Sequence, residues 1–249
     1  MRIIVTGGNS GIGKATAGAL AAAGHSVTIA CRTIPKAEQA AAEMAGNVEV
    51  RHLDLADLTA VRRFADSVDS VDVLVNNAGV AESASLARTE PEFWDRHLRV
   101  NATGPYLATR AVLPGMLERG WGRVINIASL AGLYGSPYVT AYTASKHALV
   151  GFTRALATEV AGRGVTVNAL CPGYVATDMV WRGARNIVDK TGKSFEDAVQ
   201  ALAQMNPGQR LIEPEEVAEA AARLLDDAAS NGECIVLDGT TPAPGGTRP

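Results

Sequence analysis

The chain has 249 residues, a formal net charge of −3 and a hydrophobic fraction of 47%. This length suits one α/β domain or at most two small ones, and the apolar content excludes disorder over most of the chain. The small net charge gives no reason to expect a nucleic-acid partner.

Cysteines, histidines and apolar runs argue against several further classes of protein. The three cysteines are widely separated and the four histidines lack ligand spacing, so we expect neither a disulfide framework nor a metal site. No uninterrupted apolar run approaches the roughly 20 residues that span a bilayer, and the start of the chain lacks the pattern of a signal peptide. We therefore expect a cytoplasmic protein with no membrane partner.

Short apolar runs alternate with helical patterns along the chain. The apolar runs predict strands at residues 2–6, 27–30, 48–53, 71–75, 124–128, 165–170 and 234–237. The helical patterns predict helices at residues 11–23, 35–44, 58–68, 91–119, 140–162 and 214–226. This alternation indicates an α/β fold with one doubly wound parallel sheet of about seven strands and helices on both faces.

Two segments depart from this alternation. Residues 178–208 follow Pro172-Gly173 beyond the carboxyl end of a strand, and we expect a substrate lid there because long insertions at such places are usually functional. Residues 239–249 have no periodicity and are predicted to form a mobile tail. No linker interrupts the chain, so residues 1–249 are expected to form a single domain.

A glycine-rich turn follows the first strand and runs directly into a helix. Gly7, Gly11 and Gly13 suit a dinucleotide pyrophosphate, because the backbone must approach it without a Cβ atom in the way. Tight turns also favour glycine. The placement between the first strand and the first helix favours cofactor binding over this simpler interpretation.

The end of the second strand carries the residues expected to select the cofactor. An NAD-selecting chain typically has Asp or Glu here, whereas this chain has Cys31-Arg32-Thr33. A guanidinium pairs with a 2′-phosphate, so Arg32 favours NADP(H), with NAD(H) left open. The alternative is a solvated arginine, which is common at strand ends.

Ser129, Tyr142 and Lys146 form a candidate catalytic set. Tyr142 and Lys146 are four residues apart on one predicted helix face, and Ser129 ends the strand before that helix. A phenol with a pKa of about 10 is a poor base at neutral pH, and a nearby ammonium favours its ionised form. A Tyr-x-x-x-Lys pattern alone is common on ordinary helices. The upstream glycine turn and Ser129 make the catalytic interpretation the stronger one.

Together these motifs resemble the short-chain dehydrogenase/reductase family, in its compact single-domain branch. The resemblance extends from Thr6 to Gly239 and implies a Rossmann-type domain. Asn101, Ser129, Tyr142 and Lys146 match the family's catalytic tetrad. The residues that the resemblance implies for cofactor binding are Gly7, Asn9, Ser10, Gly11, Ile12, Gly13, Arg32, Thr33, Asp54, Leu55, Asn77, Ala78, Gly79, Tyr142, Lys146, Pro172, Gly173, Val175 and Thr177.

The resemblance also implies a role for each member of the tetrad. Tyr142 exchanges a proton with the substrate oxygen, and Ser129 orients that oxygen. Lys146 holds the nicotinamide ribose and lowers the Tyr142 pKa, while Asn101 supports a water-mediated proton relay. One departure concerns the cofactor, because several NADP-specific relatives have a basic residue where this chain has Ser10.

The resemblance implies an NADP(H)-dependent enzyme that interconverts ketones and secondary alcohols. From Asn101 onward, including Met205-Asn206-Pro207, the chain looks more like 3-hydroxyacyl-CoA dehydrogenases and β-ketoacyl reductases, which suggests acyl-CoA or acyl-carrier thioesters. Reduction of small or aromatic ketones is the first alternative. A non-catalytic NADP-sensing regulator is the second, and the intact tetrad argues against it. The family also implies a homotetramer that pairs through the helices at 91–119 and 140–162.

Overall fold

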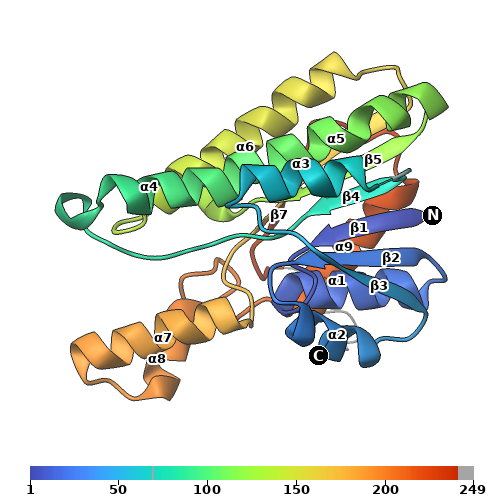
Figure 1. Cartoon of the computed structure of the whole chain (residues 1–249). Helices are drawn as coiled ribbons and strands as arrows, with labels where there is room; N and C mark the ends of the chain where they lie inside the picture. Colours follow the sequence, from blue (N-terminus) through green and yellow to red (C-terminus); the bar gives the residue numbers. More distant parts are fainter. Residues whose placement is uncertain (69, 241–249) are drawn as a thin grey trace.

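The computed structural model describes residues 1–68 and 70–240, and its centre is one parallel sheet of seven strands. The strand order is β3-β2-β1-β4-β5-β6-β7, with every neighbouring pair parallel, which confirms the predicted doubly wound topology (Figure 1). The strands are β1 (Arg2–Thr6), β2 (Ser26–Cys31), β3 (Asn47–His52), β4 (Val73–Asn76), β5 (Gly122–Ile127), β6 (Val165–Pro172) and β7 (Cys234–Leu237).

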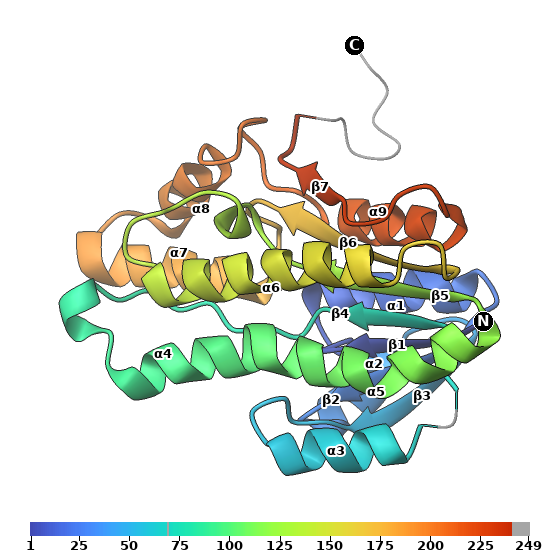
Figure 2. The same cartoon turned by 90° about the horizontal axis from the view of Figure 1, so that it is seen from above.

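Helices cover both faces of the sheet. In Figure 1, α1, α2 and α9 lie on one side, and α3, α5 and α6 lie on the other. Figure 2 shows α6 running beside the α4–α5 run across the sheet. The helices are α1 (Gly11–Ala22), α2 (Ile34–Ala42), α3 (Leu58–Asp66), α4 (Pro91–Leu98), α5 (Gly104–Arg119), α6 (Thr140–Glu159), α7 (Asp178–Thr191), α8 (Phe195–Ala203) and α9 (Pro214–Asp226).

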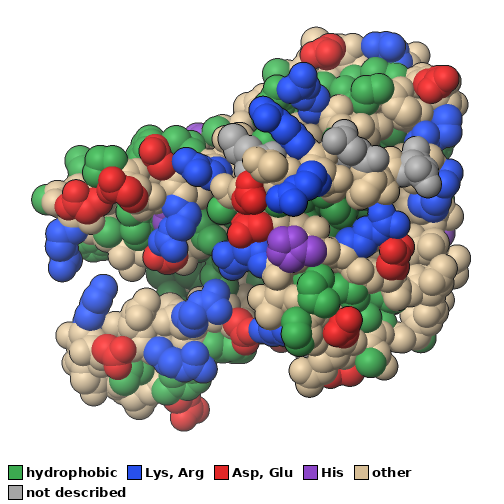
Figure 3. Space-filling model, viewed as in Figure 1, with side chains coloured by type: hydrophobic (Ala, Val, Ile, Leu, Met, Phe, Trp, Pro, Cys, Tyr) green, Lys and Arg blue, Asp and Glu red, His purple; other side chains and the backbone are tan. Residues whose placement is uncertain are grey.

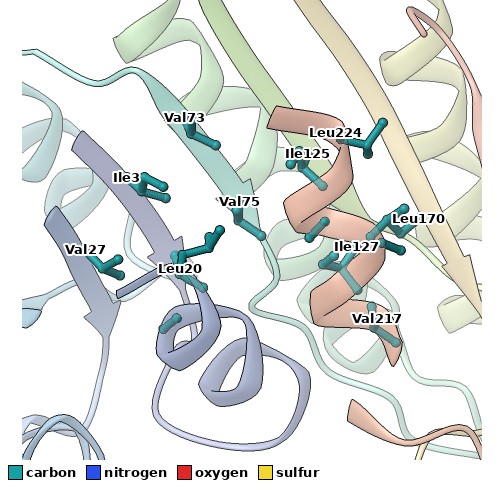
Figure 4. Close-up of a cluster of buried hydrophobic side chains, with 14 of the residues drawn as sticks. Ile3, Leu20, Val27, Val73, Val75, Ile125, Ile127, Leu170, Val217 and Leu224 are labelled. Atoms are coloured by element: carbon teal, nitrogen blue, oxygen red, sulfur yellow. The ribbon is translucent and has the colours of Figure 1, made fainter. Parts of the chain in front are cut away.

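The core follows from the alternation of side chains along buried parallel strands. Ile3, Val73 and Ile125 point to the face covered by α1 and α9, where Leu20 and Leu224 pack against them (Figure 4). Residues at intervening positions of the same strands pack on the opposite face under α3, α5 and α6. Because both faces are covered, strands such as β1 and β4 carry almost unbroken apolar runs, which is the signal that predicted them.

The predicted helix at 91–119 is interrupted in the structure. A five-residue π-helical turn, Arg99–Thr103, separates α4 from α5 and contains Asn101. Single π-helical turns inside α-helices are frequently found at functional sites. The sequence could not indicate the interruption, since the apolar spacing continues through it.

The insertion at 178–208 is largely helical. Helices α7 and α8 lie antiparallel and form a small lobe beyond the carboxyl ends of the strands (Figure 1). The lobe has its own apolar centre, to which Val180, Ala184, Ala198 and Leu202 contribute. The predicted tail reaches past residue 240, and residues 241–249 lie outside the described part of the chain. No helix within the described residues is long and apolar enough to cross a membrane.

Candidate functional site

The glycine turn between β1 and α1 is held in place by Thr6. The Thr6 hydroxyl accepts hydrogen bonds from the backbone N–H groups of Asn77 (3.0 Å) and Ala78 (3.1 Å), which follow β4. Gly7 and Gly11 have φ angles of +66° and +51°, in the region that favours glycine. Two neighbouring strand ends are thereby joined at the carboxyl edge of the sheet.

Asn77 braces the same turn from the other side. Its amide Nδ2 donates to the carbonyl oxygens of Thr6 (2.9 Å) and Gly7 (3.2 Å). A Cβ atom on Gly13 would lie only 2.3 Å from this nitrogen, so no larger residue fits at the start of α1. The turn therefore leaves its backbone and the α1 N-terminus open to a phosphate group, as a dinucleotide cradle requires.

The segment that leads into the lobe closes beside the glycine turn. A Cβ atom on Gly11 would lie 2.9 Å from Cγ2 of Thr177, the residue just before α7. Lys36 on α2 forms an ion pair with Asp178 at 3.6 Å. Thr177, which ends the segment that follows Pro172-Gly173, is thus brought next to the glycine turn.

Two further pairs of predicted cofactor residues lie at the next strand ends along the same edge. Arg32 and Thr33 follow β2 and are exposed, and Thr33 precedes the first turn of α2. Asp54 and Leu55 follow β3, where the Asp54 carboxylate accepts the Ala56 N–H at 2.9 Å. An exposed guanidinium at this edge is available to a phosphate on an adenosine ribose.

The three catalytic candidates converge at the ends of β5 and α6. Ser129 follows β5, and its side chain interacts with the phenol of Tyr142 on α6. Lys146, one turn further along α6, is 5% exposed and donates a 2.7 Å hydrogen bond to the Ile127 carbonyl. Its Nζ atom lies 5.8 Å from the centre of the Tyr142 ring.

Burial governs the ionisation of this set. It raises the pKa of Tyr142, which the Ser129 hydroxyl lowers in part, and it lowers the pKa of Lys146 to about 8. The expected lowering of the Tyr142 pKa by Lys146 is therefore not found in this structure. The reason is that Lys146 directs its ammonium to the Ile127 carbonyl, while desolvation acts on both groups.

Asn101 lies in the π-helical turn, fully buried, and contacts two parts of the site. Its Oδ1 accepts the Val80 N–H at 2.9 Å, and its Nδ2 donates to the Val80 carbonyl at 2.8 Å and to the Ser145 hydroxyl at 2.9 Å. A Cβ atom on Gly79 would lie 3.2 Å from Asn101 Oδ1 and 3.7 Å from Lys146 Nζ. The predicted tetrad and the segment after β4 therefore meet in one place.

Two residues beside the site were not among those predicted for it. Tyr174, directly after Pro172-Gly173, lies near the Tyr142 phenol, and buried Asn206 holds the Tyr174 backbone. Their positions next to Pro172-Gly173 and within Met205-Asn206-Pro207 were visible in the sequence. The position of Tyr174 beside Tyr142 depends on Asn206, which lies in the loop that follows α8 and is far from Tyr174 in sequence.

The chain forms a doubly wound α/β domain in which the glycine turn and the Ser, Tyr and Lys side chains converge on the same sheet edge. This combination defines a dehydrogenase/reductase class of oxidoreductase. The comparisons with known proteins agree, since residues 1–187 match the profile of the short chain dehydrogenase family. The chain belongs to this family, and the resemblance noted in its sequence is confirmed.

Relatives and solved structures cover almost the whole chain. It is 38% identical over 234 residues to D-beta-hydroxybutyrate dehydrogenase of Cupriavidus necator, covering 91% of each chain. It is 37% identical over 248 residues to the 3-oxoacyl-acyl-carrier-protein reductase of Synechocystis, covering 95% of this chain and 94% of the relative. A crystal structure of an actinorhodin polyketide ketoreductase variant with NADPH superposes with a TM-score of 0.91 and 35% identity, covering 96% of this chain and 95% of the other.

Proposed function

We propose that this chain is an NADP(H)-dependent oxidoreductase that interconverts a ketone and a secondary alcohol, with Tyr142 as general acid and base. The observation that carries the proposal is the meeting of Ser129, Tyr142 and Lys146 at the sheet edge that also holds the glycine turn. The family membership and the ketoreductase among the relatives support the same reaction class.

Each catalytic residue has a task that follows from its chemistry. Tyr142, kept protonated by its raised pKa, donates a proton to the carbonyl oxygen in reduction and accepts one from the alcohol in oxidation. Ser129 donates a hydrogen bond to the same oxygen and orients it. Lys146, with a pKa of about 8, can exchange a proton near neutral pH, and buried Asn101 positions the Gly79–Val80 backbone beside it. We propose that this route returns the proton to Tyr142.

We propose that the dinucleotide is held by the glycine turn, Asn77–Gly79, Lys146 and the segment from Pro172 to Thr177. When bound, its nicotinamide would supply or accept the hydride that the proton transfer accompanies. Exposed Arg32, with Thr33 beside it, would bind the 2′-phosphate and favour NADP(H) over NAD(H). The ketoreductase structure with NADPH supports this preference.

We propose that the α7–α8 lobe is a lid over the substrate, and that the substrate is a 3-ketoacyl or 3-hydroxyacyl thioester. Figure 3 shows the surface hollowed between this lobe and the region of α4, with Lys and Arg as well as Asp and Glu side chains around the opening. The Lys and Arg side chains suit the phosphates of a coenzyme A or acyl-carrier arm. Relatives that act on hydroxybutyrate and 3-oxoacyl groups support this substrate class over simple ketones.

A substrate screen tests the proposal. Purified protein should oxidise NADPH, and NADH more slowly, when acetoacetyl-CoA is supplied, and the 3-hydroxy product should be detectable by mass spectrometry. Simple and aromatic ketones serve as competing substrates, and faster turnover of those would favour the general carbonyl reductase. Tight NADPH binding without turnover of any carbonyl compound would instead favour the non-catalytic regulator.

We further propose that the protein forms a homo-oligomer through the exposed faces of α5 and α6. A groove between these helices is lined by apolar Tyr106, Leu113 and Phe152 together with charges of both signs, Arg110 and Glu159 among them. A second copy related by a two-fold axis would cover the apolar strip and pair opposite charges. Analytical ultracentrifugation should show a dimer or tetramer, and Tyr106→Asp should dissociate it.

We infer a cytoplasmic location from the thiols. Cys31, Cys171 and Cys234 are all unpaired, as expected in a reducing compartment. Fractionation of the source cells, with recovery of the protein in the cytoplasmic fraction, tests this inference.

A further inference from the structure

Tyr174 stands out because its backbone is fixed on both sides at the base of the lobe. Its N–H donates to Asn206 Oδ1 at 2.8 Å, and its carbonyl accepts from Asn206 Nδ2 at 2.9 Å and from the Ile212 N–H at 3.0 Å. Asn206 itself is 1% exposed, and its Nδ2 also donates to the Arg210 carbonyl at 2.6 Å. The direction of the Tyr174 side chain is thus set by a buried polar clamp and not by a free loop.

The Tyr174 ring lies between the lobe and the catalytic set. It packs against the apolar centre of the lobe, to which Val180 and Ala184 belong. Its phenol is also close enough to Tyr142 for a charge on one to raise the pKa of the other, and burial raises the pKa of Tyr174 itself. Tyr174 is therefore a neutral hydrogen-bond donor at physiological pH.

The Tyr174 hydroxyl has no hydrogen-bond partner in the protein among residues 1–68 and 70–240. The side chains of Asn206 and Lys146 are engaged elsewhere, Asn206 by the backbone clamp and Lys146 by the Ile127 carbonyl. The half-buried Tyr174 phenol can therefore donate a hydrogen bond to a ligand. Because it lies beside the Tyr142 phenol, which is proposed to act on a carbonyl, the two together suit a ligand with two nearby oxygen atoms.

We propose that Tyr174 is a specificity-determining residue whose hydroxyl donates a hydrogen bond to the second oxygen of a 1,3-dioxygenated substrate, the C1 carbonyl of a 3-ketoacyl thioester or ester. The inference rests on the proposed function and deepens it, because Tyr142 would take the C3 oxygen while Tyr174 takes the C1 oxygen. A neutral donor at this place suits an uncharged thioester or ester carbonyl better than a carboxylate, whose charge would need a cation for compensation.

The test compares two ketones of similar size in the wild type and in Tyr174→Phe. Ethyl acetoacetate carries the second oxygen, and 2-hexanone lacks it. We expect Tyr174→Phe to lower kcat/KM for ethyl acetoacetate by about tenfold, the value of one neutral hydrogen bond, and to change kcat/KM for 2-hexanone by less than about threefold. Much of the loss should appear in KM, since the contact is made in the ground state as well. Acetoacetate as a third substrate tests the stated preference for an uncharged group.

Tyr134→Phe is the matched control, because it removes an equivalent hydroxyl from a side chain that is 64% exposed. Thermal unfolding and NADPH binding should be unchanged in both variants. If Tyr174 acted only through its electrostatic effect on Tyr142, Tyr174→Phe would change the pH profile of kcat/KM equally for both ketones. Equal losses on both ketones, or no loss on ethyl acetoacetate, would overturn the role of Tyr174. If the wild type reduces neither ketone, the proposed function itself fails, and the inference falls with it.

Discussion

The Lys146 ammonium donates a hydrogen bond to the Ile127 carbonyl at 2.7 Å, although only 5% of the residue is exposed. The ends of α6 and β5 are joined by this contact, and it places an amine beside the Tyr142 ring. A buried ammonium with a neutral partner costs free energy, which explains why the pKa of Lys146 falls to about 8. The site therefore holds a group that destabilises the folded chain.

Stability should show this cost through its pH dependence. Below pH 8 the folded state must bury a charged Lys146, and between about 8 and 10.5 only the unfolded chain retains the proton, so this group makes stability rise with pH. We expect Lys146→Met to unfold at a higher denaturant concentration than the wild type at neutral pH. The gain in the free energy of unfolding should be at most about 3 kcal/mol, reduced by the contribution of the lost hydrogen bond to Ile127. The gain should shrink near about pH 10. Exposed Lys190→Met is the control, and an equal effect at both pH values would contradict the burial account.

Tyr142→Phe should abolish turnover while leaving NADPH binding nearly intact. The substitution removes only the hydroxyl that exchanges the proton, so we expect kcat to fall by at least about a hundredfold. Stopped-flow absorbance measures the turnover, and fluorescence titration measures the binding. Retained turnover would show that another group transfers the proton.

Arg32→Asp should move cofactor preference from NADP(H) towards NAD(H). The carboxylate would repel a 2′-phosphate and accept hydrogen bonds from the ribose hydroxyls of NAD(H). We expect the ratio of kcat/KM for NADPH to that for NADH to fall by roughly a hundredfold, consistent with loss of a charged hydrogen-bond pair. Arg62→Asp introduces the same charge change elsewhere on the surface and should leave the ratio unaltered. An unchanged ratio in Arg32→Asp would mean that Arg32 does not select the cofactor.

Gly13→Ala should be strongly destabilising, because the new Cβ atom would lie 2.3 Å from Asn77 Nδ2 and 2.5 Å from the Gly7 carbonyl. Either the glycine turn or Asn77 must move, and we expect a loss of about 1–3 kcal/mol together with weaker NADPH binding. Gly18→Ala on the same helix is the matched control. Its Cβ atom would meet only Met44 Cγ at 3.6 Å, so helix propensity predicts a gain of up to about 1 kcal/mol. Similar behaviour of the two variants in denaturant unfolding would contradict the close approach at Gly13.

The Glu216 carboxylate should make the fold sensitive to acid. Arg210 binds both of its oxygens at 2.6 Å and holds the pKa of Glu216 below its usual value, so its contribution is present above about pH 4.5 and lost as the pH falls. We expect Glu216→Gln to lower stability at neutral pH by about 1–3 kcal/mol and to reduce the difference between neutral and acidic pH. Glu215→Gln changes an exposed neighbour in the same helical turn and should have little effect.

Local sequence signals were sufficient for most of the fold. Apolar runs at 2–6 and 234–237 match β1 and β7 to the residue, and the helix at 214–226 matches α9, because proline and a capping Glu mark its start. Two predictions were incomplete. Residues 91–119 contain a π-helical turn in which Asn101 bonds to Val80 and Ser145, and residues 178–208 form helices whose apolar faces mainly pack on each other. Contacts of that kind have no local periodicity.

The sequence of 249 residues, with its many glycines and small net charge, determined a single α/β domain. It also determined the position of the glycine turn and the spacing of Tyr142 from Lys146, because backbone conformation and helical periodicity are local properties. The tertiary structure alone decided how those residues ionise and what lies beside them. It buried Lys146 against a carbonyl, raised the Tyr142 pKa by desolvation, and placed Tyr174 next to the catalytic phenol through the Asn206 clamp. Burial and long-range packing set these features, and both depend on chain segments that are far apart in sequence.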